Sequence, residues 1–136
     1  MTIAWVFPGQ GSQKIGMANK IINLPNAKNR FSYASEVFDR NLLEICAQNP
    51  DAKNISDDLN NTKNTQICLF LVESVLLDSL QANGFQPSFV AGHSLGEISA
   101  LYCANVLSFE ECVFLIKERS ELMADAAKGS MAALLG

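Results

Sequence analysis

Apolar residues along the chain follow two different spacings, and the alternation between them predicts an α/β domain. Short runs of β-favouring residues at Ile3–Phe7 and Phe89–Ala91 predict two buried strands. A third apolar run, Ser130–Leu135, predicts the start of another strand. Longer stretches with apolar positions three and four residues apart predict helices. Strands that alternate with helices favour a mostly parallel sheet with flanking helices.

Helices are predicted where this longer spacing lies between turn-forming or polar residues. They cover Asn26–Leu42, continued or restarted over Leu43–Ala47, then Gln66–Asn83, Leu95–Ala104 and Ser108–Ala127, with one or two helical turns over Met17–Ile22. The last long helix begins with the capping-box pattern of Ser108 and Glu111. The polar segment 49–64 predicts a surface connection, and no composition break indicates a second domain.

Composition supports a globular protein with a real core. The chain has 136 residues, of which 49% are hydrophobic and 18% charged. Its formal net charge of −4 disfavours binding to a nucleic-acid backbone. No basic segment precedes the first apolar run, and the densest apolar stretch, Ile67–Val72, is too short to cross a bilayer. We therefore expect a soluble, cytoplasmic protein that binds neither nucleic acid nor membrane.

The cysteines and the single histidine do not form a metal-binding pattern. The four cysteines are Cys46, Cys68, Cys103 and Cys112. None belongs to a C-x-x-C pair, and three of the four fall among apolar residues in predicted helices. Small buried thiols are the simplest interpretation. His93 alone does not supply a zinc site. We expect no metal and no resident cofactor.

The strongest chemical signal is Gly92-His93-Ser94-Leu95-Gly96, which lies between a predicted strand and a predicted helix. This G-x-S-x-G pattern is typical of a nucleophile elbow, in which a serine occupies a sharp, strained turn. Side chains at the two glycine positions would collide with the neighbouring strand and helix. The N-terminus of the following helix favours a developing oxyanion. The pattern therefore predicts Ser94 as a catalytic nucleophile.

His93 is adjacent to Ser94, but it is a poor candidate for the general base. Adjacent residues at a sharp turn point in different directions, whereas a base must reach the serine hydroxyl at about 3 Å. We expect His93 to pack against or orient groups at the site, and we group it with the substrate-binding residues. The base is then expected outside these 136 residues.

The glycine-rich loop Pro8–Gln13 follows the first strand, where a dinucleotide-binding fold would carry its fingerprint. The spacing to the next glycine, Gly16, fits neither that fingerprint nor a phosphate-binding loop. At the end of a neighbouring strand, such a loop can face the elbow and donate a backbone N–H to an oxyanion. A plain tight turn explains the composition equally well.

Arg119 stands out because of its position along the last helix. The helix that leaves the elbow rises about 1.5 Å per residue, or roughly 14 Å in all. An antiparallel return from Phe109 to Arg119 descends by a similar distance, which places Arg119 level with Ser94. A guanidinium there suits a substrate that carries a carboxylate. A surface arginine paired with Glu118 or Glu121 is the alternative.

Three motifs together resemble malonyl-CoA:acyl carrier protein transacylase of fatty acid synthesis, and the acyltransferase domains of polyketide synthases look similar. The motifs are Phe7–Gln13, Gly92–Glu97, and Lys117-Glu118-Arg119 with Met123. The resemblance covers the whole chain in order and implies an α/β hydrolase-like core. It also implies that residues 1–136 are the N-terminal part of a single acyltransferase core domain. The family's small ferredoxin-like subdomain, catalytic histidine and second specificity motif would then be absent from these residues.

The resemblance also implies roles for individual residues. Ser94 would carry the malonyl group as an ester, and the backbone N–H groups of Gln10 and Leu95 would form the oxyanion hole. Arg119 would bind the malonyl carboxylate, and Gln66 would contribute to substrate binding. Malonyl-CoA would be the acyl donor and acyl carrier protein the acceptor. One departure is that Ile67 follows Thr65-Gln66, where the family often has proline.

Two other interpretations stay open at this point. A serine esterase or lipase shares the elbow, although several strands usually precede its serine, and Arg119 does not suit a neutral ester. Without a base, the chain is also consistent with a non-catalytic fragment, a binding module, or half of a split enzyme. The acidic composition leaves unexplained where an acidic carrier protein would dock.

Overall fold

The fold is α/β, with one small sheet and five helices in the residues that the structure describes. The computed structural model describes residues 2–47, 58–127, 129, 130, 132 and 134. In chain order the elements are β1 (Ala4–Phe7), α1 (Ala27–Phe38), α2 (Leu42–Ala47), α3 (Thr62–Ala82), β2 (Phe89–Gly92), α4 (Gly96–Cys103) and α5 (Phe109–Asp125).

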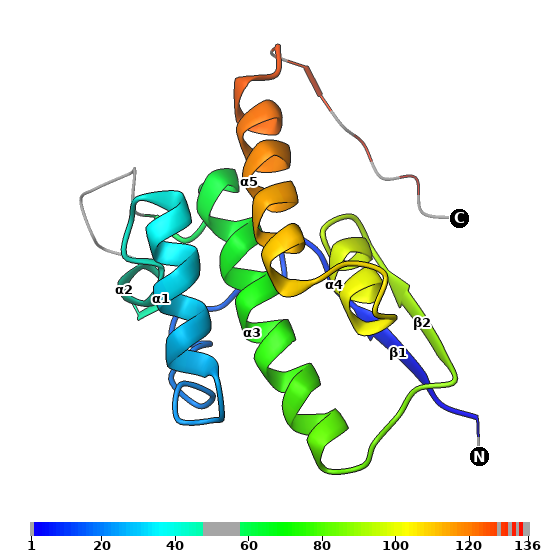
Figure 1. Cartoon of the computed structure of the whole chain (residues 1–136). Coiled ribbons are helices and arrows are strands. Elements are labelled where there is room, and N and C mark those ends of the chain that lie inside the picture. Colours follow the sequence, from blue (N-terminus) through cyan, green and yellow to red (C-terminus); the bar gives the residue numbers. More distant parts are fainter. Residues whose placement is uncertain (1, 48–57, 128, 131, 133, 135–136) are drawn as a thin grey trace.

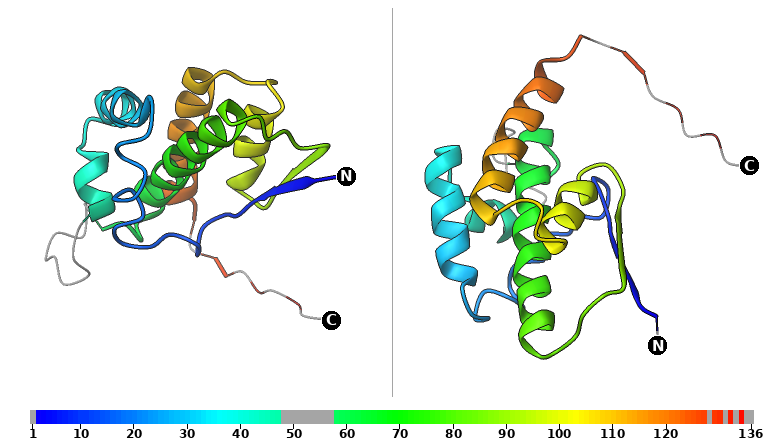
Figure 2. Two further views of the ribbon diagram at one scale, coloured as in Figure 1. Left: turned by 90° about the horizontal axis from the view of Figure 1, so that it is seen from below. Right: turned by 45° about the vertical axis from the view of Figure 1, so that its right-hand side comes forward.

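Helix α3 is the centre of the molecule. It lies between α1 and α2 on one side and α4 with the two strands on the other, and α5 packs across it (Figures 1 and 2). By length and composition alone α3 could cross a membrane. Its apolar side chains instead form the core with the other helices. Four of them have no exposed surface: Ile67, Cys68, Phe70 and Leu71. The apolarity of α3 is thus that of a central core helix.

The sheet confirms the predicted parallel pairing, but it is smaller and less buried than the sequence suggests. β1 and β2 pair in parallel, with Ala4 opposite Phe89 and Phe7 opposite Gly92. Residues 130, 132 and 134 of the predicted third strand have no strand structure, and the remainder of that run lies outside the described residues. Val6 and Phe89 are 74% and 67% exposed, so the prediction of two buried strands was wrong. Within the described chain, α4 and α3 cover only the face that carries Trp5 and Phe7.

Local backbone conformations explain the other differences from the predicted elements. The helix predicted over residues 26–42 ends at Phe38 because Asp39 is left-handed, with φ 51°, and α2 then begins at Leu42. α3 begins at Thr62 rather than Gln66, because the Asn61 side chain caps it by accepting a hydrogen bond from the Lys63 N–H. Residues 62–64 were therefore wrongly assigned to a surface connection. Residues 16–22 form successive turns, and α5 ends at Asp125.

Two smaller predictions are confirmed. The Ser108 and Glu111 capping box is formed in both directions at the start of α5. All four cysteines are free and buried. Burial raises the pKa of Cys112 to about 12, which keeps this thiol protonated and unreactive at neutral pH.

A partly buried carboxyl group joins α3 to α4. The Ser99 hydroxyl donates a hydrogen bond to Glu73 Oε2, and in the described part of the chain Glu73 Oε1 is buried without a partner. Desolvation raises the pKa of Glu73 from 4.5 to about 7, against the opposing effect of the Ser99 hydrogen bond. The protonated carboxyl therefore favours the folded state. This stabilisation is complete below about pH 4.5 and is lost as the pH rises through about 7.

We expect Glu73→Gln to flatten the pH dependence of stability. The glutamine keeps an acceptor for Ser99 but does not ionise, so up to about 3 kcal/mol of pH-dependent destabilisation should disappear between pH 4.5 and 7.5. Urea midpoints measured across this interval test the prediction. Glu36→Gln, at an exposed position of α1, is the matched control. An unchanged slope in Glu73→Gln would exclude this carboxyl as the source.

Candidate active site

The elbow has the strained geometry that its sequence predicts. β2 ends at Gly92, α4 begins at Gly96, and Ser94 between them has a left-handed φ of 55°. A Cβ at Gly92 would lie 2.0 Å from the carbonyl carbon and oxygen of Gly96, and a Cβ at Gly96 would lie 2.1 Å from the Phe7 carbonyl oxygen. These distances confirm that both positions exclude side chains. The first glycine lets the helix approach the elbow, and the second lets it approach β1.

We expect Gly96→Ala to disrupt the elbow strongly. The atoms that the new methyl group meets belong to the backbone of β1 and the following loop, which cannot move aside as a flexible side chain would. Overpacking of this kind costs about 1–3 kcal/mol or more. Thermal unfolding measures the loss. Gly129→Ala is the control, because its nearest neighbour would lie 3.9 Å away; equal melting temperatures for the two variants would contradict the packing argument.

The glycine-rich loop lies directly against the elbow. A Cβ at Gly9 would be 2.5 Å from the His93 carbonyl oxygen and 3.3 Å from Ser94 Cβ. The His93 N–H donates to the Phe7 carbonyl at 3.0 Å, which continues the β1–β2 pairing to the base of the elbow. The sequence allowed the loop to be a plain turn or a part of the site. Because Gly9 lies against His93 and Ser94, the structure favours a part of the site.

Two backbone N–H groups beside Ser94 are available to a ligand. The N–H groups of Gly96, Glu97 and Ile98 donate to carbonyls within the elbow and the first turn of α4. Within the described chain, neither the Leu95 N–H nor the Gln10 N–H donates a hydrogen bond. Unsatisfied amides next to a nucleophile are the groups from which oxyanion holes are built. The roles of Leu95 and Gln10 as oxyanion donors stay predictions.

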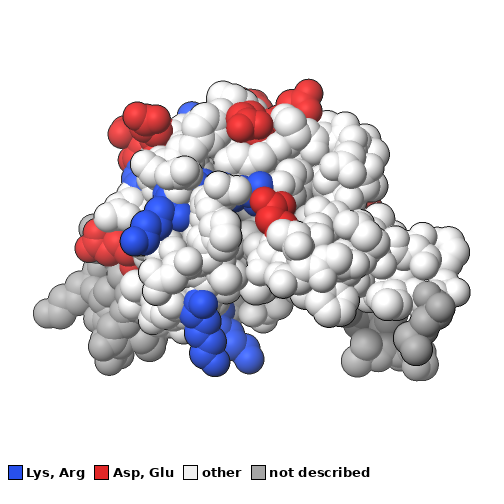
Figure 3. Space-filling model, turned by 60° about the horizontal axis from the view of Figure 1, so that its bottom comes forward, with Lys and Arg blue, Asp and Glu red and all other residues white. Residues whose placement is uncertain are grey.

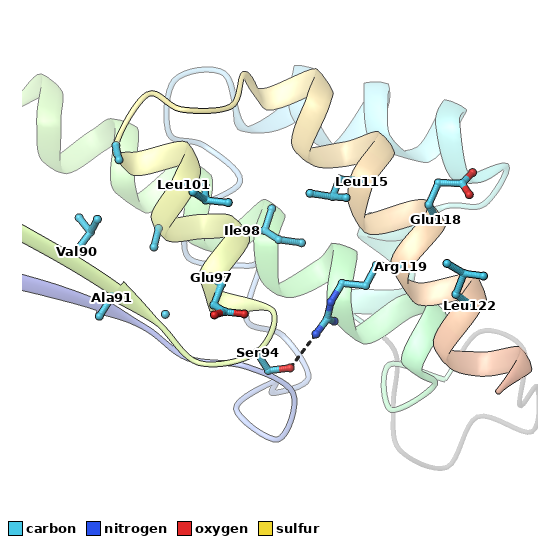
Figure 4. Close-up of a pocket in the computed structure, with 13 residues that line it drawn as sticks. Val90, Ala91, Ser94, Glu97, Ile98, Leu101, Leu115, Glu118, Arg119 and Leu122 are labelled. Carbon is cyan, nitrogen blue, oxygen red and sulfur yellow. Dashed lines mark hydrogen bonds between the residues drawn. The ribbon is translucent and has the colours of Figure 1, made fainter. Parts of the chain in front are cut away.

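Arg119 lies where the helix geometry predicts, level with Ser94. Its Nη2 donates to Ser94 Oγ at 3.0 Å (Figure 4). Its Nη1 donates to Gln66 Oε1. Gln66 is fully buried, and its Nε2 donates to Met123 Sδ at 3.3 Å. Among the described residues, Arg119 forms no ion pair with a glutamate, so the alternative pairing with Glu118 or Glu121 is wrong. A buried amide therefore orients the guanidinium toward the serine.

His93 does not act on Ser94 in this arrangement. Its side chain is exposed, and its Nδ1 would lie 3.4 Å from a Cβ at Gly9. In the part of the chain that the structure describes, Ser94 Oγ bonds to Arg119 and to no imidazole or carboxylate. The location of His93 agrees with packing against the glycine loop.

A cavity of about 860 Å³ opens beside the serine. Apolar side chains of α4 and α5 form much of its wall, and Ser94 and Arg119 also line it, with the Arg119 side chain pointing toward Ser94 (Figure 4). These apolar residues are Ile98, Ala100, Leu101, Leu115 and Leu122. A cavity of this size and polarity suits a small organic ligand whose charged end reaches the arginine. On the face of the molecule shown in Figure 3, most of the surface is uncharged, and basic and acidic side chains are scattered over it.

Sequence reasoning missed two polar residues that contact the glycine loop. Asn60 and Thr62 were assigned to the surface connection, but their side chains bond to Gln13 and Gln10. A signal was present: Thr62 lies one helical turn before Gln66, which places the two on one face of a helix. The late predicted start of α3 concealed this relationship.

The chain resembles acyltransferases in both sequence and structure. The acyl transferase domain family matches residues 4–135. A malonyl CoA-acyl carrier protein transacylase from Synechocystis is 47% identical over 135 residues, covering 99% of this chain and 44% of the relative. The crystal structure of the malonyl-CoA:ACP transacylase from Synechocystis superposes with a TM-score of 0.81 at 45% identity, over 91% of this chain and 40% of that structure.

A second similar structure contains a partner. It is a type II PKS acyl carrier protein in complex with its malonyl-transacylase, with a TM-score of 0.82 and 37% identity over 94% of this chain and 40% of that structure. This chain thus spans about two fifths of the length of the relatives it matches.

Proposed function

Because this chain belongs to the acyl transferase domain family, we propose that it is the nucleophile-bearing part of a malonyl-CoA:acyl carrier protein transacylase. The observation that carries the proposal is the Arg119 guanidinium, held 3.0 Å from Ser94 Oγ by a buried glutamine. A fixed cation beside a nucleophile suits an acyl group that ends in a carboxylate. The malonyl group is such an acyl group, and the printed names of the relatives agree with it.

The reaction has two transfer steps. Ser94 Oγ attacks the thioester carbonyl of malonyl-CoA, the C–S bond breaks, and coenzyme A leaves as the thiol while malonyl stays on the serine as an ester. The phosphopantetheine thiol of acyl carrier protein then attacks the ester, the C–O bond breaks, and the serine hydroxyl is restored. No atom changes its oxidation state in either step. Coenzyme A is part of the substrate and not a resident cofactor.

The free N–H groups of Gln10 and Leu95 stabilise the oxyanion that forms in both steps. The negative charge develops on the carbonyl oxygen as the tetrahedral intermediate forms, and N–H groups that are already in place donate hydrogen bonds to this oxygen without reorganising. One donor comes from the loop after β1 and the other from the turn after β2. The close contact of Gly9 with His93 and Ser94 brings these two segments together.

Arg119 binds the malonyl carboxylate while Ser94 attacks the other end of the acyl group. The guanidinium has five N–H donors, and two hydrogen bonds, to Ser94 and Gln66, are described for it. The remaining donors can form a paired contact with a carboxylate. Gln66 acts on the substrate through Arg119, and His93 borders the site from the loop side.

The proton of Ser94 requires a general base, which we place outside these residues. The proposal is supported by the absence of an imidazole or carboxylate bonded to Ser94 among the described residues. We also assign to the rest of the protein the remainder of the hydrolase-like core and a separate ferredoxin-like subdomain. The reaction would take place in the cytoplasm, in fatty acid or polyketide synthesis.

Incubation of the full-length gene product with malonyl-CoA and holo acyl carrier protein tests the proposal. Intact-mass spectrometry should show a malonyl ester on the enzyme and then malonyl on the carrier thiol. Peptide mapping should place the ester on Ser94. Release of free malonate with no malonyl-carrier would instead identify a hydrolase, and no acylation at all would reject the proposal.

A further inference from the structure

The glycine-rich loop is fastened to the start of α3 by two pairs of side chains. Gln10 Nε2 donates to Thr62 Oγ1 at 2.7 Å, and Thr62 Oγ1 donates to Gln10 Oε1 at 3.0 Å. Gln13 Nε2 donates to Asn60 Oδ1 at 2.9 Å. The loop and the helix are 52 residues apart in sequence at the first contact, so these bonds are tertiary and not part of a local turn.

The loop needs such an attachment because its own hydrogen bonds do not fix Gln10. The Gly9 carbonyl accepts from the Ser12 N–H at 3.3 Å and from Ser12 Oγ at 2.8 Å, and the Gly11 N–H donates to Gln13 Oε1 at 2.7 Å. Gly11 has a φ of 106°, which only glycine adopts easily. In the described part of the chain, the backbone N–H of Gln10 has no partner, and its side chain is bonded only to Thr62.

The same face of α3 also holds the arginine. Thr62 and Gln66 are four residues apart and therefore lie one above the other on the helix. Thr62 contacts the loop that carries Gln10, and Gln66 accepts from Arg119, which contacts Ser94. The first two turns of α3 thus contact both the loop that lies against the elbow and the arginine that donates to Ser94.

We propose that Thr62 is a positioning residue that aims the Gln10 N–H at the oxyanion by holding the Gln10 side chain. The proposal rests on the function proposed above, in which that N–H is an oxyanion donor. A donor on a glycine-rich loop is effective only when the loop is held in its working geometry, because oxyanion stabilisation depends on preorganisation. Thr62 itself touches no reacting atom; it acts through Gln10.

Thr62→Val in the full-length protein tests this role. Valine has nearly the shape of threonine but no hydroxyl, so the Gln10 attachment is lost with little change in packing. We expect kcat to fall about threefold to tenfold, by the same factor for malonyl and acetyl donors, while KM stays within about twofold. Thr62→Ser keeps the hydroxyl and should recover most of kcat. An unchanged kcat in Thr62→Val, or an equal loss in Thr62→Ser, would overturn the proposal.

A double-mutant cycle with Gln10→Ala separates positioning from a general loss of structure. Gln10→Ala removes the same side-chain contact but keeps the backbone N–H. If Thr62 acts through its contact with the Gln10 side chain, Thr62→Val should lower kcat little further once Gln10 is alanine. Fully multiplicative losses in the double variant would show that Thr62 acts by another path and would reject the assignment.

A readout without turnover distinguishes a failure of this inference from a failure of the proposed function. Backbone ¹⁵N relaxation at Gln10 and Gly11 in the full-length protein should show lower order parameters in Thr62→Val, with α3 unchanged. A loop that stays as ordered as in the unmodified protein overturns the positioning role whatever the activity. Absence of malonyl transfer by the unmodified protein counts against the proposed function, and the relaxation data still decide whether Thr62 holds the loop.

Discussion

Ser94→Ala in the full-length protein should abolish the malonyl-enzyme and reduce malonyl transfer by at least about 10⁴-fold. The alanine has no oxygen to form the ester, and the described residues next to Ser94 offer no replacement nucleophile: His93 points to the glycine loop, and Arg119 is cationic. Intact-mass measurement after incubation with malonyl-CoA detects the acyl-enzyme directly, and transfer to holo acyl carrier protein gives the rate.

The Ser94 variant should keep its fold, so that the loss can be assigned to chemistry. Serine and alanine both carry a Cβ, and the strain of the left-handed φ of 55° is therefore similar in the two proteins. A matched control is Ser79→Ala near the end of α3, which removes a hydroxyl far from the site. If Ser94→Ala still acquires a malonyl group, the nucleophile is another residue and the proposed mechanism is wrong.

Arg119→Ala should change the choice of acyl group and not only the rate. Loss of the guanidinium removes the partner of the malonyl carboxylate, so kcat/KM for malonyl-CoA should fall about 10²-fold to 10³-fold. Acetyl-CoA has no carboxylate to pair with the partly buried Arg119 cation, so its use should be unchanged or improved when that cation is removed. The ratio of the two kcat/KM values is the measurement.

Two further variants sharpen the interpretation of Arg119. Arg119→Lys keeps the charge but loses the paired geometry, and its malonyl preference should lie between those of the unmodified protein and Arg119→Ala. Glu121→Ala, two positions along α5 and without an ion pair to Arg119 among the described residues, is the control. Equal losses with malonyl-CoA and acetyl-CoA in Arg119→Ala would remove Arg119 from carboxylate binding and leave it a purely structural role.

The parts of the site that could be predicted from the sequence depend on short-range geometry. The elbow needs only a strand, a turn with glycines at fixed positions and a helix, and all three are encoded within residues 89–104. The height of Arg119 beside Ser94 follows from two consecutive helices and a constant rise per residue. Both groups are therefore placed by elements that are adjacent in the chain.

Contacts between distant segments could not be predicted in the same way. The pairing of Gln10 with Thr62 joins segments 52 residues apart, and the bond of Arg119 to Gln66 joins segments 53 residues apart. No periodicity relates these positions; they meet because α3 crosses the centre of the molecule. The buried position of Gln66 was also hidden, since a glutamine in a helix is usually exposed.

The predicted boundaries of helices were wrong where the conformation or side chain of a single residue ends or begins the helix. Asp39 interrupts an amphipathic pattern that otherwise continues to Leu42, and only its left-handed conformation ends the helix. Aspartate tolerates this conformation better than most residues. Asn61 caps α3 from within a polar segment that looks like a loop. The apolar composition of the strands predicted burial, but apolar composition alone does not say how many faces are covered.

The parallel pairing of β1 with β2 sets the order in which the nucleophile can be assembled during folding. The first contact of this pairing joins Ile3 to Ser88, which are 85 residues apart, and all of α1, α2 and α3 lie between them. Closing a loop of this length is slow compared with forming helices. During synthesis at about 5–20 residues per second, β1 must wait several seconds for its partner. We therefore expect α1, α2 and α3 to form before the sheet does, and the elbow, with Gly96 against Phe7, to be completed only after β2 has been made. The strained geometry of Ser94 is then acquired late in folding.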